Sequence, residues 1–391
     1  MLKPLFLKPG RDDAARRRHP WVFSRALSGP PPGAAEEIEV RSASGTLLGR
    51  GFASPRSSIA ARLWRFDDGP LDAAFVSGRV QAAARLRERL VPPLTDGYRL
   101  VHTEGDGLPG LVVDRYGDVL VVQATTAGTE AARPLWLPAL RALFPGASIL
   151  QRNDLASRHG EGLDLEDELL AGEPAPGRVP FRERGLTYLA DLAGGQKTGF
   201  FLDQRENRHL IGGLAAGRSV LNLFSYSGAF GVAALAGGAS RVTHVDTSEP
   251  ALALARENHA ANAQDLACVE TVAADVFEDL RARVARGETW DVVVTDPPAF
   301  AKKTPDVDRA CRGYKDVNRL ALKLLAPDGV LLACSCSGPV STDLFQKVLF
   351  AASLDAGVPA RILERRGAGP GHPVSIDCPE TEYLKAFLLA R

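Results

Sequence analysis

The chain has 391 residues, of which 45% are hydrophobic, and its 47 basic and 47 acidic residues give a formal net charge of zero. This length predicts two or three domains with buried cores, and the balanced charge excludes nucleic-acid binding through net charge alone. No apolar run approaches the roughly 18 residues of a membrane span, and the amino terminus lacks the pattern of a signal peptide. We therefore expect a cytoplasmic, globular protein that does not act at a membrane.

The five cysteines include no Cys-x-x-Cys pair. An odd number of such thiols predicts neither a disulfide framework nor a zinc site. We therefore expect no bound metal, and a cysteine with a special role is expected to be a reactive thiol.

Residues 1–70 are predicted to form a small β domain. Short apolar strands, separated by turns rich in Gly, Pro and Ser, are expected at 37–40, 47–53 and 59–66. This region has 12 Lys/Arg against 7 Asp/Glu, and Arg16, Arg17 and Arg18 follow one another. The basic run is a candidate RNA-binding segment, although a solvated charged run beside a core tryptophan gives the same pattern.

Residues 71–180 are predicted to form a compact α+β domain. Its expected elements are a helix at 71–90, strands at 98–102, 111–113, 119–123 and 148–151, and a helix at 129–143. Segments 104–107 and 114–118 are rich in Gly and Asp and are predicted to be turns. Prolines between Pro174 and Pro180 indicate a linker, so the third domain is predicted at 181–391.

The third domain is organised around residues 219–230. An apolar strand at 219–223 is followed by a turn of small and polar residues around Ser225, and a second apolar segment begins at Ala229. This pattern predicts a buried strand, a tight nucleotide-binding turn and the start of a helix. Asp246 ends the next strand, where a carboxylate can bind ribose hydroxyls.

The glycine spacing of this turn is not Gly-x-Gly-x-x-Gly, so a pyrophosphate is poorly provided for. The turn therefore favours an adenosine ligand without phosphates, S-adenosylmethionine, over a nicotinamide dinucleotide.

Strands and helices alternate beyond Asp246. The expected elements are helices at 248–262, 309–325 and 342–356 and strands at 269–273, 290–295 and 330–333. This order predicts an α/β, Rossmann-like domain with a mostly parallel sheet, which binds ligands at the carboxyl ends of its strands. The polar residues that fall at predicted strand ends are Asn222, Asp246, Asp275, Asp296 and Cys336.

Several motifs closely resemble those of one family, the bacterial methyltransferases that modify C5 of a cytosine in large-subunit (23S) ribosomal RNA. The matching segments are HPWVFS (19–24), QKTGFFLDQR (196–205), NLFSYSGAF (222–230), VVVTDPPAF (292–300) and CSCSG (334–338). The resemblance implies an amino-terminal PUA domain that binds RNA, a small central α+β domain, and a Rossmann-like domain that uses S-adenosylmethionine.

The chemistry of such a reaction requires one well-placed cysteine. C5 of cytosine is a poor nucleophile until a thiolate adds at C6. The family pattern places this nucleophile at Cys336, and Asp296 is the candidate to bind the N3/N4 edge of the base. Cys334 shares a face with Cys336 only if the strand continues. Core packing is the simpler role for Cys311.

The cofactor residues follow from their positions in the predicted sheet and from the resemblance. Asp246 is expected to bind the ribose and Asp275 the adenine amine, with Asp296 nearby. The expected lining of the methionine half is Phe224, Ser225, Tyr226 and Gly228, the last because a side chain there would crowd the ligand. Residues expected to contact cofactor or RNA are Lys197, Thr198 and Arg205, and Arg205 serves equally well in a structural ion pair.

Two departures keep other reactions open. Ala299 stands where many RNA cytosine-C5 methyltransferases carry a second cysteine. The Asp-Pro-Pro-Ala-Phe form also resembles enzymes that methylate exocyclic amines without a cysteine. The alternatives are therefore amine methylation of an RNA base and an inactive RNA-binding assembly factor. The sequence leaves open the target nucleotide, the base that removes the C5 proton, and whether the protein is a homodimer.

Overall fold

The structure, a computed structural model, describes residues 2–391, and its contacts divide the chain into two compact units. The first comprises the chain up to Arg184 together with Ala190–Phe200 and Pro370–Thr381. The second comprises Gly185–Leu189, Phe201–Gly369 and Glu382–Arg391. The change of unit after Arg184 lies close to the boundary predicted at 181. The return of two later segments to the first unit was not predicted.

The amino-terminal part of the first unit is the predicted β domain. A five-stranded sheet in the order β1-β3-β4-β5-β2 is formed by Lys3–Phe6, Glu37–Arg41, Leu47–Ala53, Ile59–Arg65 and Trp21–Phe23, and the short helix α1 spans Asp13–Arg16. Side chains of β3 alternate between buried and half-buried, as expected for a strand with one face in a core. Strands β1 and β2 were missed because each has at most four residues.

The remainder of the first unit is an α+β fold. Its sheet has the order β10-β9-β8-β7-β6 and is formed by Glu168–Ala171, Ser148–Gln151, Val119–Ala124, Leu111–Tyr116 and Gly97–His102. The helices are α2 (Ala73–Leu90), α3 (Ala127–Ala131), α4 (Arg133–Leu143) and α5 (Ala156–Glu161). The hairpin of β11 (Arg178–Glu183) and β12 (Leu186–Asp191) follows, and the first four residues of β12 belong to the second unit. The helix predicted at 129–143 is divided at Ala132, and Pro134 lies in the first turn of α4.

The prediction of a turn at 114–118 is wrong for its first three residues. Asp114, Arg115 and Tyr116 belong to β7, and only Gly117 and Asp118 lie outside a strand. Asp114 is fully buried there because Arg99 donates two hydrogen bonds to its carboxylate, at 2.5 and 2.8 Å. A buried carboxylate is stable when it is paired in this way.

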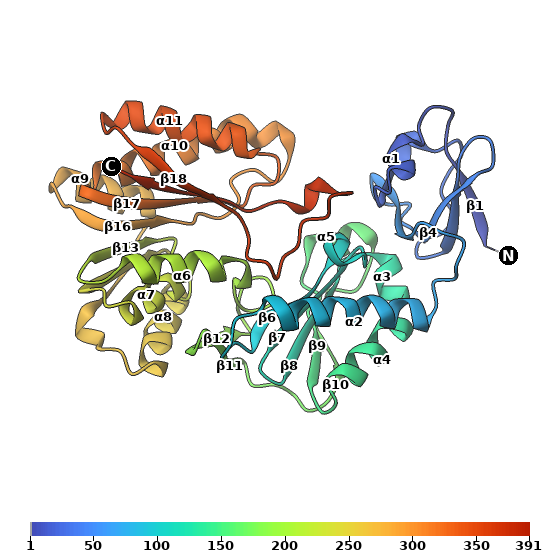
Figure 1. Ribbon diagram of the computed structural model, residues 1–391, viewed down its shortest axis with the longest axis horizontal. Coiled ribbons are helices and arrows are strands. Elements are labelled where there is room, and N and C mark those ends of the chain that lie inside the picture. The colour runs from blue at the N-terminus through green and yellow to red at the C-terminus, as the bar shows by residue number, and fades with distance from the viewer. Residues whose placement is uncertain (1) are drawn as a thin grey trace. The chain divides into compact units, whose positions relative to one another are not determined.

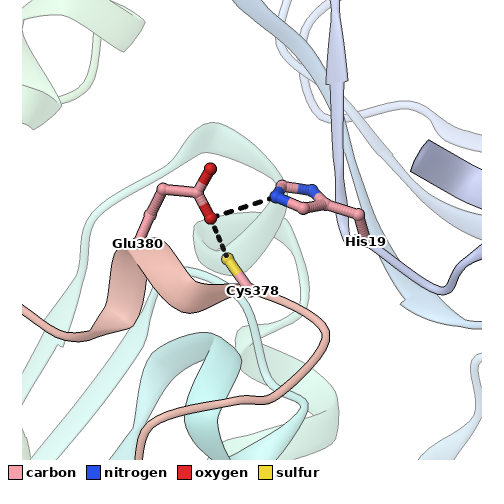
Figure 2. Close-up of side chains that lie close together, drawn as sticks. All are labelled: His19, Cys378 and Glu380. Atoms are coloured by element: carbon pink, nitrogen blue, oxygen red, sulfur yellow. Dashed lines mark hydrogen bonds and ion pairs between the residues drawn. The ribbon is translucent and has the colours of Figure 1, made fainter.

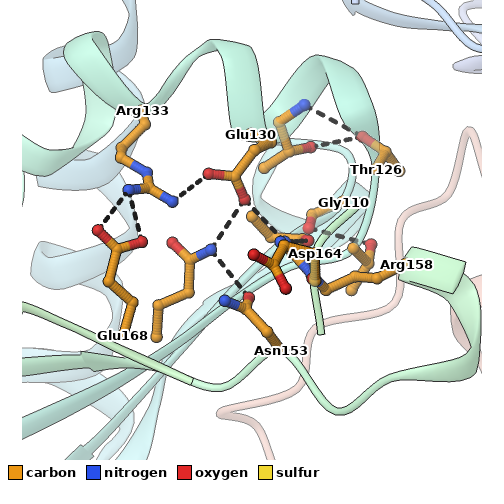
Figure 3. A network of polar contacts seen from close by, with 12 residues as sticks. Gly110, Thr126, Glu130, Arg133, Asn153, Arg158, Asp164 and Glu168 are labelled. Atoms are coloured by element: carbon orange, nitrogen blue, oxygen red, sulfur yellow. Dashed lines mark hydrogen bonds and ion pairs between the residues drawn. The ribbon is translucent and has the colours of Figure 1, made fainter. Parts of the chain in front are cut away.

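A second polar network stabilises the central fold around Glu130 of α3 (Figure 3). Its carboxylate accepts hydrogen bonds from Arg133, from Arg158 at 2.7 Å and from Gln151 at 2.8 Å. These partners come from α4, α5 and β9, so one half-buried acid links three elements.

The second unit contains the predicted Rossmann-like sheet, in the order β15-β14-β13-β16-β17-β19-β18. The strands are β13 (Ser219–Leu223), β14 (Arg241–Asp246), β15 (Val269–Ala273), β16 (Trp290–Thr295), β17 (Leu325–Ser335), β18 (Arg361–Arg366) and β19 (Lys385–Ala390). The first five are parallel, and β19 is antiparallel to both of its neighbours. The sequence did not predict β18 and β19.

Helices cover both faces of this sheet. One face carries α6 (Arg205–Leu214), α7 (Ala229–Ala236) and α8 (Glu249–Ala261), and the other carries α9 (Val276–Ala285), α10 (Val307–Lys323) and α11 (Thr342–Ala356) (Figure 1). Ser248 caps α8 through the Ala251 amide, and Gly357 ends α11 in the left-handed conformation, both as predicted. The α/β class is therefore confirmed. Across residues 2–391, every helix is too short or too polar to cross a bilayer.

Candidate active site

The turn after β13 has a strained backbone. Phe224, Tyr226 and Gly228 have φ values of 54°, 45° and 70°. Non-glycine residues adopt positive φ at a cost of about 1–2 kcal/mol each, and such strain clusters at functional sites. The predicted nucleotide turn is therefore present, and α7 begins directly after it.

Gly228 is constrained by the protein around it. A Cβ atom at this position would lie 2.6 Å from Cβ of Ala255 and 3.1 Å from Cε1 of His244. Packing against α8 and β14, together with the positive φ, explains the glycine. Crowding of a ligand by a side chain at this position stays a prediction.

Asp246 ends β14 next to this turn. Its Oδ2 accepts a hydrogen bond from the Tyr226 amide at 2.8 Å, and its Oδ1 accepts one from the Ser248 amide at 2.9 Å. Each carboxylate oxygen has two lone pairs, so these bonds orient the group and leave acceptors for two ribose hydroxyls.

The other expected cofactor residues offer matching groups. Ser225 is 7% exposed, and its hydroxyl has no hydrogen-bond partner within the described chain. Asp275 caps α9 with Oδ1 alone, which accepts from the amides of Phe277 and Glu278, so its other oxygen is available to an amino group. Phe224 packs edge-on against Phe277, with ring centroids 6.3 Å apart. These groups fit an adenosine ligand.

Asn222 belongs to the core beneath the turn and not to the ligand edge. It is 1% exposed, and its Nδ2 donates to Nδ1 of His244 at 3.1 Å. The Nε2 atoms of His244 and His259 are 2.9 Å apart, and Nδ1 of His259 is 2.6 Å from Oε1 of Gln264. The bonds fit two neutral imidazoles, each donating to the next residue. Burial, with a smaller contribution from His259, lowers the pKa of His244 to about 3.

The predicted nucleophile and acid follow adjacent parallel strands. Asp296 comes directly after β16, Cys336 comes directly after β17, and the two strands pair at Thr295 and Ala333. The half-buried Cys336 thiol is 3.8 Å from the carbonyl oxygen of Pro297, to which it donates. The thiol therefore lies beside the Asp-Pro-Pro loop.

Cys334 lies in a different environment. Strand β17 continues through Ser335, and Cys334 is fully buried in the core on the α6–α7 side of the sheet. Burial raises its pKa well above the ordinary value, and the charge of Asp296 raises it further. Cys334 is therefore an inert core thiol. Cys311 is half-buried on α10 and packs against the core of the opposite face.

The turn that carries Cys336 is held by contacts that the sequence did not reveal. The fully buried Ser337 hydroxyl accepts from the Ala301 amide at 3.0 Å and lies 2.8 Å from the Tyr314 hydroxyl. Its carbonyl oxygen accepts from Nζ of Lys385 at 2.6 Å. Lys385 was missed because β19 was not predicted, although a lone lysine in the apolar run 384–390 was an available signal.

Thr198 has a structural role within the first unit. It is fully buried, donates to Oδ2 of Asp114 at 2.5 Å and lies 2.8 Å from the Tyr116 hydroxyl. The contact with cofactor or RNA expected of its hydroxyl is therefore replaced by bonds to the protein. Lys197 precedes it with a φ of 54°, and a contact between its side chain and cofactor or RNA stays a prediction.

The basic residues expected to bind RNA divide into two groups. Arg205 is buried at the start of α6, and its Nε donates to Glu206 at 2.9 Å. Arg205 therefore forms the structural ion pair given as its alternative role, and a contact with cofactor or RNA stays a prediction. Arg16, Arg17 and Arg18 are exposed on the β domain and are available to phosphates.

Three side chains of metal-binding type meet in the first unit: His19, Cys378 and Glu380 (Figure 2). Nδ1 of His19 accepts from the Trp21 amide, so Nε2 carries the proton that is donated to Glu380 at 3.1 Å. The Cys378 thiol donates to the same carboxylate at 3.6 Å, and burial raises its pKa. Hydrogen bonds thus account for all three groups, and they join the segment at His19 to the segment 378–380.

These features of the second unit define a class of enzyme. A Rossmann-like sheet with a strained turn after its first strand in the sequence and a carboxylate at the end of the next is typical of S-adenosylmethionine-dependent methyltransferases. Residues 129–388 match the family model of these enzymes, and residues 5–66 match a PUA-like domain. The chain therefore belongs to the S-adenosylmethionine-dependent methyltransferase family, with S-adenosylmethionine as its cofactor.

Individual relatives are similar over nearly the whole chain. The ribosomal RNA large subunit methyltransferases I of Serratia proteamaculans and Escherichia coli O139:H28 are each 44% identical to it, covering 98% of both chains. A Streptococcus mutans protein assigned to the S-adenosylmethionine-dependent methyltransferases shares the fold, with a TM-score of 0.86 and 24% identity over 100% of both chains. A methyltransferase structure with S-adenosylhomocysteine has a TM-score of 0.87 and 25% identity, also over 100% of both chains.

Proposed function

We propose that this enzyme methylates C5 of a cytosine in large-subunit ribosomal RNA, through a covalent bond between the Cys336 sulfur and C6 of the base. The observation that carries the proposal is the place of Cys336, half-buried beside the Asp-Pro-Pro loop, while Cys334 is sealed in the core. The names of the relatives support the ribosomal RNA substrate, and a PUA-like domain with exposed arginines supports binding of RNA.

The reaction uses the sulfur atom twice. The Cys336 thiolate adds to C6, which moves the π electrons of the C5–C6 bond toward C5 and makes that carbon nucleophilic. When bound, S-adenosylmethionine supplies the electrophilic methyl group that C5 accepts. A base then removes the C5 proton, the C5–C6 double bond forms again, and the sulfur leaves as the thiolate.

Asp296 is proposed to orient the base. Addition at C6 places negative charge on the N3 side of the ring, which is stabilised when a carboxyl group hydrogen-bonds the N3/N4 edge in its protonated form. Asp296 comes from the strand end next to that of Cys336, as this role requires. Asp246, Asp275 and the turn Phe224–Gly228 are proposed to hold the adenosine and methionine parts of the cofactor.

The test compares Cys336→Ala with Cys268→Ala, which removes another half-buried thiol of the second unit. The substrate is large-subunit RNA from cells that lack this protein, and incorporation of labelled methyl groups is measured. Cys336→Ala should lower methyl transfer by at least about 10³-fold, as loss of a nucleophile does, while calorimetry shows unchanged S-adenosylmethionine binding. Cys268→Ala should retain activity. An active Cys336→Ala enzyme would contradict the covalent mechanism.

Methylation of an exocyclic amine is the second candidate, favoured by the sequence Asp296-Pro297-Pro298-Ala299-Phe300. Mass spectrometry of the product nucleoside separates the two, because C5-methylcytidine and N4-methylcytidine fragment differently. RNA containing 5-fluorocytidine provides an independent test, since fluorine blocks the final elimination and should trap the wild-type protein but not Cys336→Ala. Absence of S-adenosylmethionine binding would instead support an inactive RNA-binding assembly factor.

A further inference from the structure

Lys385 is a buried lysine beside the turn that carries Cys336. It is the first residue of β19, where it pairs with Ser335, and it is 3% exposed. Its Nζ donates to the carbonyl oxygen of Ser337 at 2.6 Å and to that of Tyr383 at 2.7 Å. A buried ammonium group is costly and is retained where its charge is used.

Two acceptors leave one of the three ammonium donors of Lys385 without a bond to these carbonyl groups. Ser337 directly follows Cys336, so the bond to its carbonyl oxygen holds the Lys385 ammonium beside the turn that carries the thiol. Burial lowers the pKa of Lys385 to about 8, and negative charge on Cys336 and Glu382 opposes that shift. The side chain therefore stays mainly cationic at pH 7.

Five titratable groups on neighbouring elements are neutral or negative. They come from η3 (Leu202–Gln204), the end of β16, α10, β17 and the segment before β19, and they are Asp203, Asp296, Tyr314, Cys334 and Glu382. Burial raises the pKa values of Tyr314 and Cys334, so both are neutral at pH 7. The carboxylates add negative charge to this region when the RNA base is absent, and Lys385 supplies an opposing positive charge.

We propose that Lys385 is a positioning residue that holds the Cys336 turn against β19 and stabilises the thiolate form of Cys336. This inference rests on the proposed function, in which the thiolate is both the attacking group and the leaving group. A neighbouring cation increases the thiolate fraction before attack and favours departure of the sulfur at the end.

The first test measures the thiol itself and requires no RNA. Full-length protein is treated with iodoacetamide from pH 5.5 to pH 10, and the rates at Cys336 and Cys268 are followed separately by mass spectrometry of their peptides. In the wild-type protein the alkylation midpoint of Cys336 should lie at least about one pH unit below that of Cys268. An equal or higher midpoint for Cys336 would overturn the proposal.

Two substitutions then separate charge from packing. Lys385→Met removes the ammonium and keeps the chain length, and should raise the Cys336 midpoint by about one pH unit or more, with no shift at Cys268. Lys385→Arg keeps the charge and should restore most of the wild-type midpoint. Unchanged alkylation in Lys385→Met would contradict the role of the charge, and unchanged S-adenosylmethionine affinity checks that each variant is folded.

Methyl-transfer kinetics complete the assignment. If Cys336 is the nucleophile, Lys385→Met should lower kcat about tenfold or more at pH 7 with little change in KM, and part of the loss should be recovered at pH 9. Failure of the proposed function would appear as an active Cys336→Ala enzyme, whatever the alkylation profile shows. Failure of this inference would appear as an inactive Cys336→Ala enzyme together with an unshifted profile in Lys385→Met.

Discussion

The two functional turns of the Rossmann-like sheet are stabilised in different ways. The turn Phe224–Gly228 has three positive φ values and is held by β14 and α8, which follow it in the sequence: Asp246 accepts from the Tyr226 amide, Asn258 donates to the Ser227 carbonyl oxygen, and Gly228 packs against Ala255. The turn Cys336–Gly338 is instead held by Ala301, Tyr314 and Lys385, which come from elsewhere in the chain. The first turn is therefore held by elements that follow it closely in the sequence, whereas the Cys336 turn is held by elements on both sides of it in the sequence.

Substitution of a glycine should destabilise the first turn, whereas the same substitution in the second turn should be tolerated. Gly228→Ala puts a Cβ atom within 2.6 Å of Ala255 at a φ of 70° and should lower the free energy of unfolding by about 2–4 kcal/mol. Gly338→Ala is the matched control, because nothing lies within 4 Å of its Cβ position. Urea unfolding measures both, and equal stability of the two variants would contradict the comparison.

The buried imidazoles beneath the first turn should make the free energy of unfolding of the protein sensitive to acid. The pKa of His244 is about 3 in the folded protein, against an ordinary value of 6.5. Between these two pH values the imidazole is protonated in the unfolded chain and neutral in the folded protein. Stability is therefore fully present above pH 6.5 and is lost as the pH falls toward 3, with a loss of about 2 kcal/mol between pH 7 and pH 5. Urea unfolding at the two pH values measures this loss.

The matched variant for this pH effect is His244→Gln, which has no titrating group at this position. The loss of stability between pH 7 and pH 5 should shrink in it. A wild-type protein with equal stability at both pH values would show that His244 stays accessible to protons in the folded state.

Removal of the hydrogen bonds that hold the Cys336 turn should weaken this turn in proportion to the number of bonds lost. Ser337→Ala removes the partner of the Ala301 amide and the Tyr314 hydroxyl, and should cost about 1–3 kcal/mol of stability. Tyr314→Phe removes one bond and should cost about 1 kcal/mol. Both should slow methyl transfer with unchanged S-adenosylmethionine affinity. If either variant loses the cofactor instead, the two turns are not independent.

The same contrast explains what the sequence could predict. The strand, turn and carboxylate of the cofactor site were predictable because their signals lie within the contiguous segment from Ser219 to Asp246. The role of Lys385 could not be predicted because it depends on an antiparallel strand about 50 residues after Cys336. The resemblance to a known family supplied the nucleophile, and the structure separated Cys336 from Cys334 by burial.

The burial of several polar residues could not be predicted. Thr198 and Arg205 were expected to contact cofactor or RNA because their segment lies just upstream of the predicted nucleotide turn and resembles a family motif. Both are buried, since Asp114 accepts from Thr198 across 84 residues of sequence and Glu206 pairs with Arg205. Asp114 itself was placed in a turn because its partner Arg99 comes from another strand. Burial of a polar residue depends on such distant partners, which the local pattern does not contain.

The path of the chain between β18 and β19 has a practical consequence. Residues Pro370–Thr381 belong to the first unit, and the strand that begins at Lys385 follows them almost immediately. No single cut in the polypeptide separates the two units. A recombinant fragment that begins at Phe201 would therefore contain the twelve residues Pro370–Thr381 without the rest of the unit they pack in. Evolutionary exchange of the first unit for another domain would meet the same obstacle.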